Sequence, residues 1–121
     1  MTETWDGLSL FVDDVKSSRD FYEKALGFVF PKPLGDGGTI GFREDLKLGL
    51  YDRQWQKRLG WSEGGAGGVV FSLRTEDIQT SYERLAAIAL APPARQPWRV
   101  LAFWITDPDG YRWEIWQPLA Q

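Results

Sequence analysis

The sequence predicts an α+β fold built from two copies of one unit, each a strand, a helix and then up to three strands. Three observations predict it. Short segments that alternate apolar and polar residues are followed, in each half of the chain, by a segment with helical periodicity. The start of the second half also repeats the start of the first. At 121 residues the chain suffices for one domain and is too short for two independent ones.

The first half begins with a strand and a helix. GLSLFV alternates so that its two leucines and its valine share one face. DVKSSRDFYEKALGF has one apolar face and a stopping glycine at Gly27, which predicts an amphipathic helix. FVFPKP is expected as a short edge strand limited by its prolines. GGTIGFRE and LKLGLYDR are expected as two strands separated by a turn at Glu44 and Asp45.

The second half repeats this order after a connector. QWQKRLGW is expected as one helical turn or a loop, and SEGGAGG as a flexible linker. GVVFSL then predicts a strand, TEDIQTSYERLAAIA a helix with capping residues at its start, and APPARQP a loop. WRVLAFWIT and YRWEIWQ are two strands joined by a DPDG turn. The single domain, residues 1–121, thus divides into modules at 5–53 and 67–118 with a connector at 54–66.

The internal duplication can be aligned by its letters. GLSLFV from Gly7 lies over GVVFSL from Gly68, and DVKSS from Asp14 lies over DIQTS from Asp77 after a two-residue insertion. LKLGLY matches YRWEIW, and each closes its half. The alternative is chance similarity between two amphipathic elements.

Composition removes several kinds of chemistry. The chain has no cysteine and no histidine, so disulfides, thiolate chemistry and the commonest metal ligand and general base are excluded. The 14 basic and 17 acidic side chains form no block of like charge, which argues against nucleic acid as a partner. No apolar run approaches about 18 residues, so neither a signal peptide nor a membrane partner is expected. The absence of cysteine favours a cytoplasmic location. Seven Trp and seven Phe are more than a small core needs.

The paired modules, the phrase LFVDDVKSSRDFYEKALGF and the terminal DPDGYRWEIWQ resemble the vicinal oxygen chelate superfamily. This superfamily includes glyoxalases, extradiol dioxygenases, fosfomycin resistance enzymes and bleomycin-binding resistance proteins. The resemblance covers nearly the whole chain and is closest in character to the metal-free drug-binding branch. It implies two βαβββ modules whose strands form a half-open curved sheet around a cleft, commonly completed in a homodimer.

The resemblance also implies where a divalent ion would be bound. In the metal enzymes, His or Glu side chains from the first and last strands of each module hold it. Those positions fall here at Gly7, Gly49, Gly68 and Glu114. One carboxylate cannot satisfy a divalent ion, so we expect no metal, no cofactor and an enlarged cleft where the glycines stand.

Strand parity gives candidate ligand-binding residues. If Gly7, Gly49 and Glu114 face the cleft, alternating neighbours do so too. The aromatic residues among these neighbours are Phe11, Tyr51 and Trp116. Their rings would either stack on a planar molecule or fill the barrel or a dimer interface. Glu114 could accept a ligand hydrogen bond, pair with Arg112 or Lys47, or act as a base. Trp55 and Trp61 are expected either as a lid or as a surface or dimer contact. Parity alone does not decide which face of WRVLAFWIT turns to the cleft, and Trp104 is the residue expected there. The candidate ligand-binding residues are Phe11, Tyr51, Trp104, Arg112, Glu114 and Trp116.

Three functions follow from this. The first is a metal-free protein that sequesters a hydrophobic, aromatic compound such as an antibiotic, with no catalytic residue. The net charge of −3 suits a cationic or neutral ligand. The second is a metal-dependent lyase, transferase or dioxygenase that uses Glu114 with Glu44, Asp45 or Glu63. The third is an assembly or regulatory module.

Overall fold

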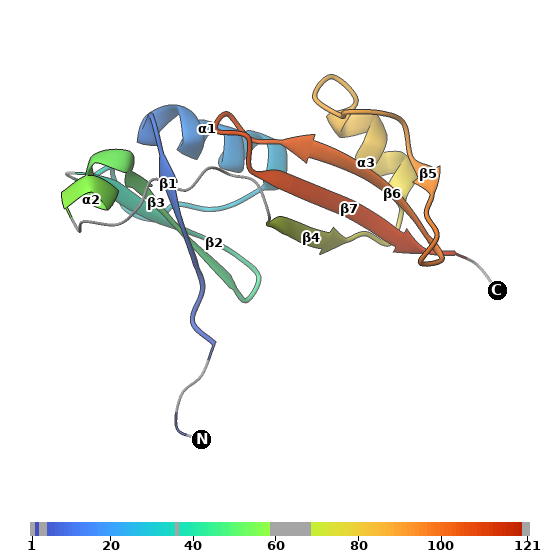
Figure 1. Ribbon diagram of the computed structural model, residues 1–121, viewed down its shortest axis with the longest axis horizontal. Coiled ribbons are helices and arrows are strands. Elements are labelled where there is room, and N and C mark those ends of the chain that lie inside the picture. The colour runs from blue at the N-terminus through green and yellow to red at the C-terminus, as the bar shows by residue number, and fades with distance from the viewer. Residues whose placement is uncertain (1, 3–4, 36, 59–68, 120–121) are drawn as a thin grey trace. The chain divides into compact units, whose positions relative to one another are not determined.

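The computed structural model describes residues 2, 5–35, 37–58 and 69–119. The chain divides into two compact units, residues 1–64 and residues 65–121. Each unit has its own β-sheet with helices beside it (Figure 1), so the predicted α+β class is confirmed. None of the helices in these ranges is long and apolar enough to cross a membrane.

The first unit is a three-stranded sheet in the order β1-β3-β2. Strand β1 runs parallel to β3, and β2 is antiparallel to β3. The strand predicted at FVFPKP is reduced to one isolated bridge between Val29 and Phe42, because Pro31 and Pro33 have no N–H to continue a ladder. The elements are β1 (Leu8–Val12), α1 (Val15–Leu26), β2 (Gly38–Arg43), β3 (Leu46–Asp52) and α2 (Arg53–Arg58).

Helix α1 begins and ends where its sequence predicts. The Asp14 carboxylate caps the start by accepting a 3.1 Å hydrogen bond from the Ser17 N–H. Gly27 ends the helix in the left-handed region at φ 70°, and its N–H donates to the Glu23 carbonyl. The buried face of the helix includes Tyr22, which is fully buried. The core of this unit therefore lies on the sheet face that carries Leu10, Val12, Leu48 and Leu50.

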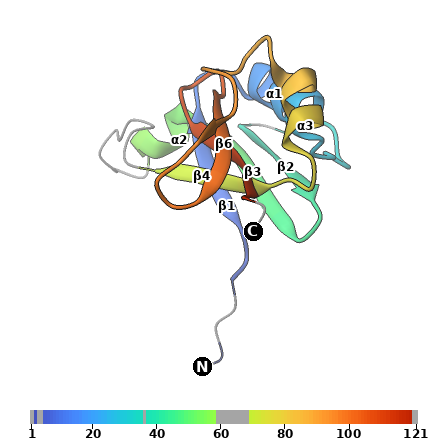
Figure 2. The same cartoon turned by 90° about the vertical axis from the view of Figure 1, so that its right-hand side faces the viewer.

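The second unit is a four-stranded sheet in the order β4-β7-β6-β5. Helix α3 follows β4 along the chain (Figure 2) and packs on β6 and β7. The helix ends at Leu85, earlier than predicted, because Ala89 is already extended and bridges Ile105. The segment predicted as a loop, APPARQP, contributes the two-residue strand β5 on the edge of β6. The elements are β4 (Val70–Arg74), α3 (Ile78–Leu85), β5 (Ala94–Arg95), β6 (Val100–Thr106) and β7 (Arg112–Pro118).

The second core and its turn also follow from the sequence. Phe103, Ile105 and Trp113 are at most 1% exposed, and the Tyr82 ring meets Phe103 edge to face at 5.6 Å. In the DPDG turn the Asp107 carboxylate is 5% exposed and accepts hydrogen bonds from two backbone N–H groups. Those bonds compensate the burial of a charged group and fix the entry into β7.

Strand pairing corrects the alignment of the two modules. Ser9 pairs with Gly49 in the first sheet, and Ser72 pairs with Glu114 in the second. If Gly49 and Glu114 are equivalent, GLSLFVDD lies over VFSLRTED without a gap, and the two N-caps Asp14 and Asp77 coincide. The predicted two-residue insertion is therefore wrong. The counterpart of Gly7 is Val70, whereas Gly68 lies outside the described residues.

Replacing the α1 cap should make stability depend less on pH. The Ser17 N–H holds the pKa of Asp14 below its usual value, so the carboxylate stabilises the fold above the unfolded-state pKa of about 4 and loses this effect as the pH falls through the folded-state pKa. Asp14→Ala should lower Tm by roughly 3–6 °C at pH 7, because the cap is lost.

Asp14→Asn keeps an acceptor and removes the titration. We expect the Tm difference between wild type and Asp14→Asn to shrink between pH 6 and pH 3 in thermal melts followed by circular dichroism. Asp20→Asn, in the middle of the same helix, is the matched control. A difference that stays constant over this range would contradict the assignment.

Candidate functional site

A pocket of about 810 Å³ opens within the first unit. It lies over the sheet face opposite the buried leucines, because residues alternate between the two faces along each strand. The volume is within the range of about 300–1,000 Å³ that small-molecule sites occupy. The described lining is Ser9, Phe11, Pro31, Lys32, Pro33, Gly35, Gly37, Gly38, Thr39, Ile40, Phe42, Tyr51 and Trp55.

Gly38 and Gly49 allow the Tyr51 ring to pack against the backbone of the sheet in this pocket. A Cβ built on Gly49 would lie 2.6 Å from Cε2 of Tyr51, and one on Gly38 would lie 2.7 Å from its Cδ1. Only a hydrogen atom fits at either position, so both glycines let the ring lie against the backbone. The cleft space predicted at Gly49 is thus wrong, because the Tyr51 ring occupies it.

Trp55 from α2 forms another wall. Its indole packs against Gly37, which has φ 83° and leaves no room for a Cβ beside the ring. The Arg58 guanidinium lies 5.1 Å from the centre of the Trp55 ring, a cation–π distance. Of the two tryptophans predicted as a lid or a contact, Trp55 therefore lines the pocket, and Trp61 lies outside the described residues.

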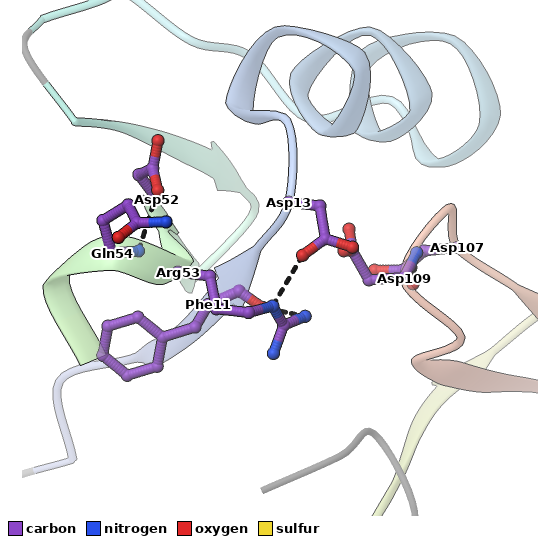
Figure 3. A network of polar contacts seen from close by, with 7 residues as sticks. All are labelled: Phe11, Asp13, Asp52, Arg53, Gln54, Asp107 and Asp109. Carbon is purple, nitrogen blue, oxygen red and sulfur yellow. Dashed lines mark hydrogen bonds and ion pairs between the residues drawn. The ribbon is translucent and has the colours of Figure 1, made fainter. Parts of the chain in front are cut away.

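The start of α2 is tied to the end of β1. The Arg53 Nε donates to the Asp13 carboxylate at 2.6 Å, and its guanidinium also reaches the Phe11 carbonyl at 3.5 Å (Figure 3). The Asp52 carboxylate accepts from the Gln54 N–H at 2.8 Å, which satisfies a backbone donor of the first helical turn. These bonds place the helix that carries Trp55 beside the strand that carries Phe11.

Phe11 and Tyr51 are the predicted site residues that the pocket brings together. They are opposite each other in the parallel pairing of β1 and β3, and their ring centres lie 6.5 Å apart at 50°. Ile40 and Phe42 also line the pocket and were not predicted. The alternation of β2 could have indicated them, because they share the face of Gly38 and stay 39% and 43% exposed.

The other predicted site residues belong to the second unit. Trp104 is directly opposite Glu114 in the pairing of β6 and β7, and Thr106 is opposite Arg112. Trp116 lies on the same face by alternation, with the Arg74 guanidinium 5.6 Å from its ring centre. Trp104, Arg112, Glu114 and Trp116 therefore share one face of this sheet, whereas the described pocket lining consists of first-unit residues.

Glu114 has a different partner from those predicted. The Ser72 hydroxyl donates to it at 3.1 Å from the neighbouring strand β4. The predicted ion pair with Arg112 is wrong within the described ranges, where the ion pairs are Arg19–Glu23, Lys47–Asp6 and Arg53–Asp13. Ser72 prevails because strand pairing places it beside Glu114, whereas Arg112 is two residues away along the strand.

The first-strand and last-strand positions do not fit a divalent ion. Gly7 has no side chain, and a Cβ there would lie 2.6 Å from the Lys47 carbonyl oxygen. Gly49 is covered by Tyr51, and Val70 offers no donor atom. Glu114 alone cannot complete a coordination sphere of several protein ligands.

The alternative acidic ligands do not form a cluster either. Glu44 and Asp45 lie in the turn between β2 and β3, and Glu63 lies outside the described residues. Within the ranges that the structure describes, no group of three or more acidic side chains could hold a metal ion.

Gly49→Ala should displace the Tyr51 ring and lower the free energy of unfolding by about 1–3 kcal/mol, because the added methyl overpacks the contact. Gly35→Ala is the matched control, since its Cβ would meet nothing closer than 3.6 Å. Urea unfolding measures both variants. In the Tyr51→Ala background Gly49→Ala should be tolerated, and an equal loss in both backgrounds would contradict the contact.

Solved structures with the same fold cover almost the whole chain. A glyoxalase/bleomycin resistance protein/dioxygenase from Nocardioides is 27% identical with a TM-score of 0.81, over 98% of this chain and 86% of that chain. A member of that superfamily from Sphaerobacter thermophilus is 27% identical with a TM-score of 0.74, over 97% and 99%. A lactoylglutathione lyase from Agrobacterium tumefaciens, 21% identical with a TM-score of 0.75 over 97% and 95%, shares the fold.

The search of curated proteins gave no match. The profile of the Glyoxalase/Bleomycin resistance protein/Dioxygenase superfamily matches residues 5–115. This match agrees with the strand, helix and strand order of both units and confirms the predicted resemblance. The chain therefore belongs to the Glyoxalase/Bleomycin resistance protein/Dioxygenase superfamily.

Proposed function

We propose that this protein binds a planar aromatic compound in the pocket of its first unit and does so without a metal ion. The observation that carries the proposal is the Tyr51 ring on Gly38 and Gly49. It places a flat apolar surface at a position where metal enzymes of the superfamily have a ligand side chain. The site is thereby suited to stacking and unsuited to coordination.

The pocket wall supplies aromatic contacts from four elements. Phe11 comes from β1, Phe42 from β2, Tyr51 from β3 and Trp55 from α2. Burial of an aromatic ligand among them contributes about 25 cal/mol per Å² of apolar surface, and each ring pair adds about 0.5–1.5 kcal/mol. An apolar cavity with a few polar groups is typical of a small-molecule site.

The same wall supports binding in preference to catalysis. The described lining contains hydroxyls at Ser9, Thr39 and Tyr51, and it contains no carboxylate to activate them. The chain has no histidine or cysteine to act as a base or nucleophile. Sequestration of an antibiotic, as the bleomycin resistance branch of the superfamily name suggests, is the proposed role.

Titration with planar antibiotics, bleomycin among them, tests the proposal through intrinsic tryptophan fluorescence, to which Trp55 in the pocket wall contributes. Tyr51→Ala and Phe42→Ala should each weaken binding roughly 5- to 30-fold, because each loses one ring contact of the wall. Trp98→Ala, which removes an exposed indole outside the pocket lining, should leave Kd unchanged. If no compound of a broad panel changes the fluorescence, and Tyr51→Ala has the same spectra as wild type, the proposal is rejected.

Metal removal separates this proposal from a metal-dependent lyase, transferase or dioxygenase. Dialysis against EDTA should change neither Kd nor Tm, and elemental analysis of the purified protein should find no stoichiometric metal. Stoichiometric Mn, Fe, Ni or Zn, with an activity that chelation abolishes, would instead establish the enzyme.

We also propose that the protein is a homodimer. Large apolar side chains on β2 and beside it support this, because Val29 is 65% exposed and Phe42 is 43% exposed. Light scattering after size exclusion should give twice the monomer mass of 13.8 kDa, and a monomer at micromolar concentration would reject the dimer.

A further inference from the structure

One charged side chain, Lys32, belongs to the described lining of the pocket. The remaining lining residues are apolar, glycine or hydroxyl-bearing, so no carboxylate in this set neutralises the ammonium group. Lys32 also forms no ion pair with any residue that the structure describes. Lys32 is exposed, and with respect to the residues that the structure describes its ammonium group is available to an acidic group of a ligand.

The backbone holds Lys32 in a defined place. Just before it, Val29 and Phe42 exchange two backbone hydrogen bonds of 2.8 and 2.9 Å, which anchor the segment on β2. The Phe30 ring packs against Gly41, where a Cβ would lie 2.5 Å from the ring. Lys32 then stands between two prolines, which fix their own φ and restrict the preceding residue to extended conformations. Binding consequently orders little more than the lysine side chain.

Three other cations of the first unit have partners among the described residues. Two of them are in ion pairs, and the third lies over an indole ring. The protein is negative overall, yet the described pocket wall carries one positive charge. The charge near the pocket affects a bound ligand more than the net charge of the protein does, because exposed charges beyond about 10 Å are largely screened at 0.1 M salt. The partnered cations are Lys47 with Asp6, Arg53 with Asp13, and Arg58 with Trp55.

We infer that the pocket takes an aromatic acid, whose ring system lies against Tyr51 and Phe42 and whose carboxylate binds the Lys32 ammonium group. This inference rests on the proposed function and adds the charge of the ligand to it. It also replaces the preference for a cationic or neutral ligand that the net charge of the chain suggested.

Three probes with one ring system test the charge. They are 2-naphthoate, its neutral methyl ester and the cation 2-naphthylmethylammonium, each titrated calorimetrically at pH 7 in 50 mM salt. The acid should bind roughly two- to fivefold more tightly than the ester, as expected for an exposed ion pair. The cation should bind more weakly than the ester. Raising the salt to 500 mM should reduce the preference for the acid.

Variants assign the preference to one residue. Lys32→Met should bring the acid-to-ester ratio close to one without changing the affinity for the ester, and Lys32→Arg should retain the preference. Lys16→Met, which removes an exposed cation from α1 outside the pocket lining, should behave as wild type. A ratio that Lys32→Met leaves unchanged would overturn the inference.

The results also separate this inference from the proposed function. If all three probes bind with equal affinity, or the cation binds most tightly, the acid preference is overturned and the aromatic binding site stands. If none of the probes binds and no planar antibiotic binds either, both are overturned.

Discussion

The contact between the Tyr51 ring and the backbone at Gly38 and Gly49 is the constraint on which the pocket depends. The adjacent strands β2 and β3 each have a glycine at this point, so no side chain prevents an aromatic ring from packing against the sheet. The same arrangement recurs at Gly37 with Trp55 and, beside the pocket, at Gly41 with Phe30. Four glycines of this unit, Gly37, Gly38, Gly41 and Gly49, therefore provide room for aromatic rings to pack against the backbone.

Under the proposed function, this constraint lets the superfamily fold bind an aromatic compound without a metal ion. The sheet of the first unit lines a pocket, and the Tyr51 ring covers the Gly49 position of β3. In the second unit the surviving carboxylate, Glu114, accepts a hydrogen bond from Ser72. The first strand of each unit thus pairs in parallel with the last strand, with a serine opposite Gly49 in one unit and opposite Glu114 in the other. The two units differ in the side chains at these paired positions.

Much of the fold follows from local patterns in the sequence. Alternation predicted the buried faces of the strands, and Asp14 and Gly27 marked the ends of α1, because caps act over a single helical turn. The end of α3 and the short strand β5 did not follow, since both depend on pairing with β6. Matching the two halves by residue type alone also misplaced Gly68 as the counterpart of Gly7. The register of β4 is set by its hydrogen bonds to β7, which residue types do not reveal.

For the candidate site, the sequence by itself determined that histidine and cysteine chemistry is absent, that Gly7 and Gly49 have no side chain to bind a metal, and that Phe11 and Tyr51 share a face. Only the tertiary structure decided that Tyr51 covers Gly49, that Trp55 and Phe42 complete the wall, and that Lys32 is the charge within it. The reason is physical. Periodicity fixes the direction of a side chain relative to its own strand, whereas the space that it fills depends on neighbours distant in sequence.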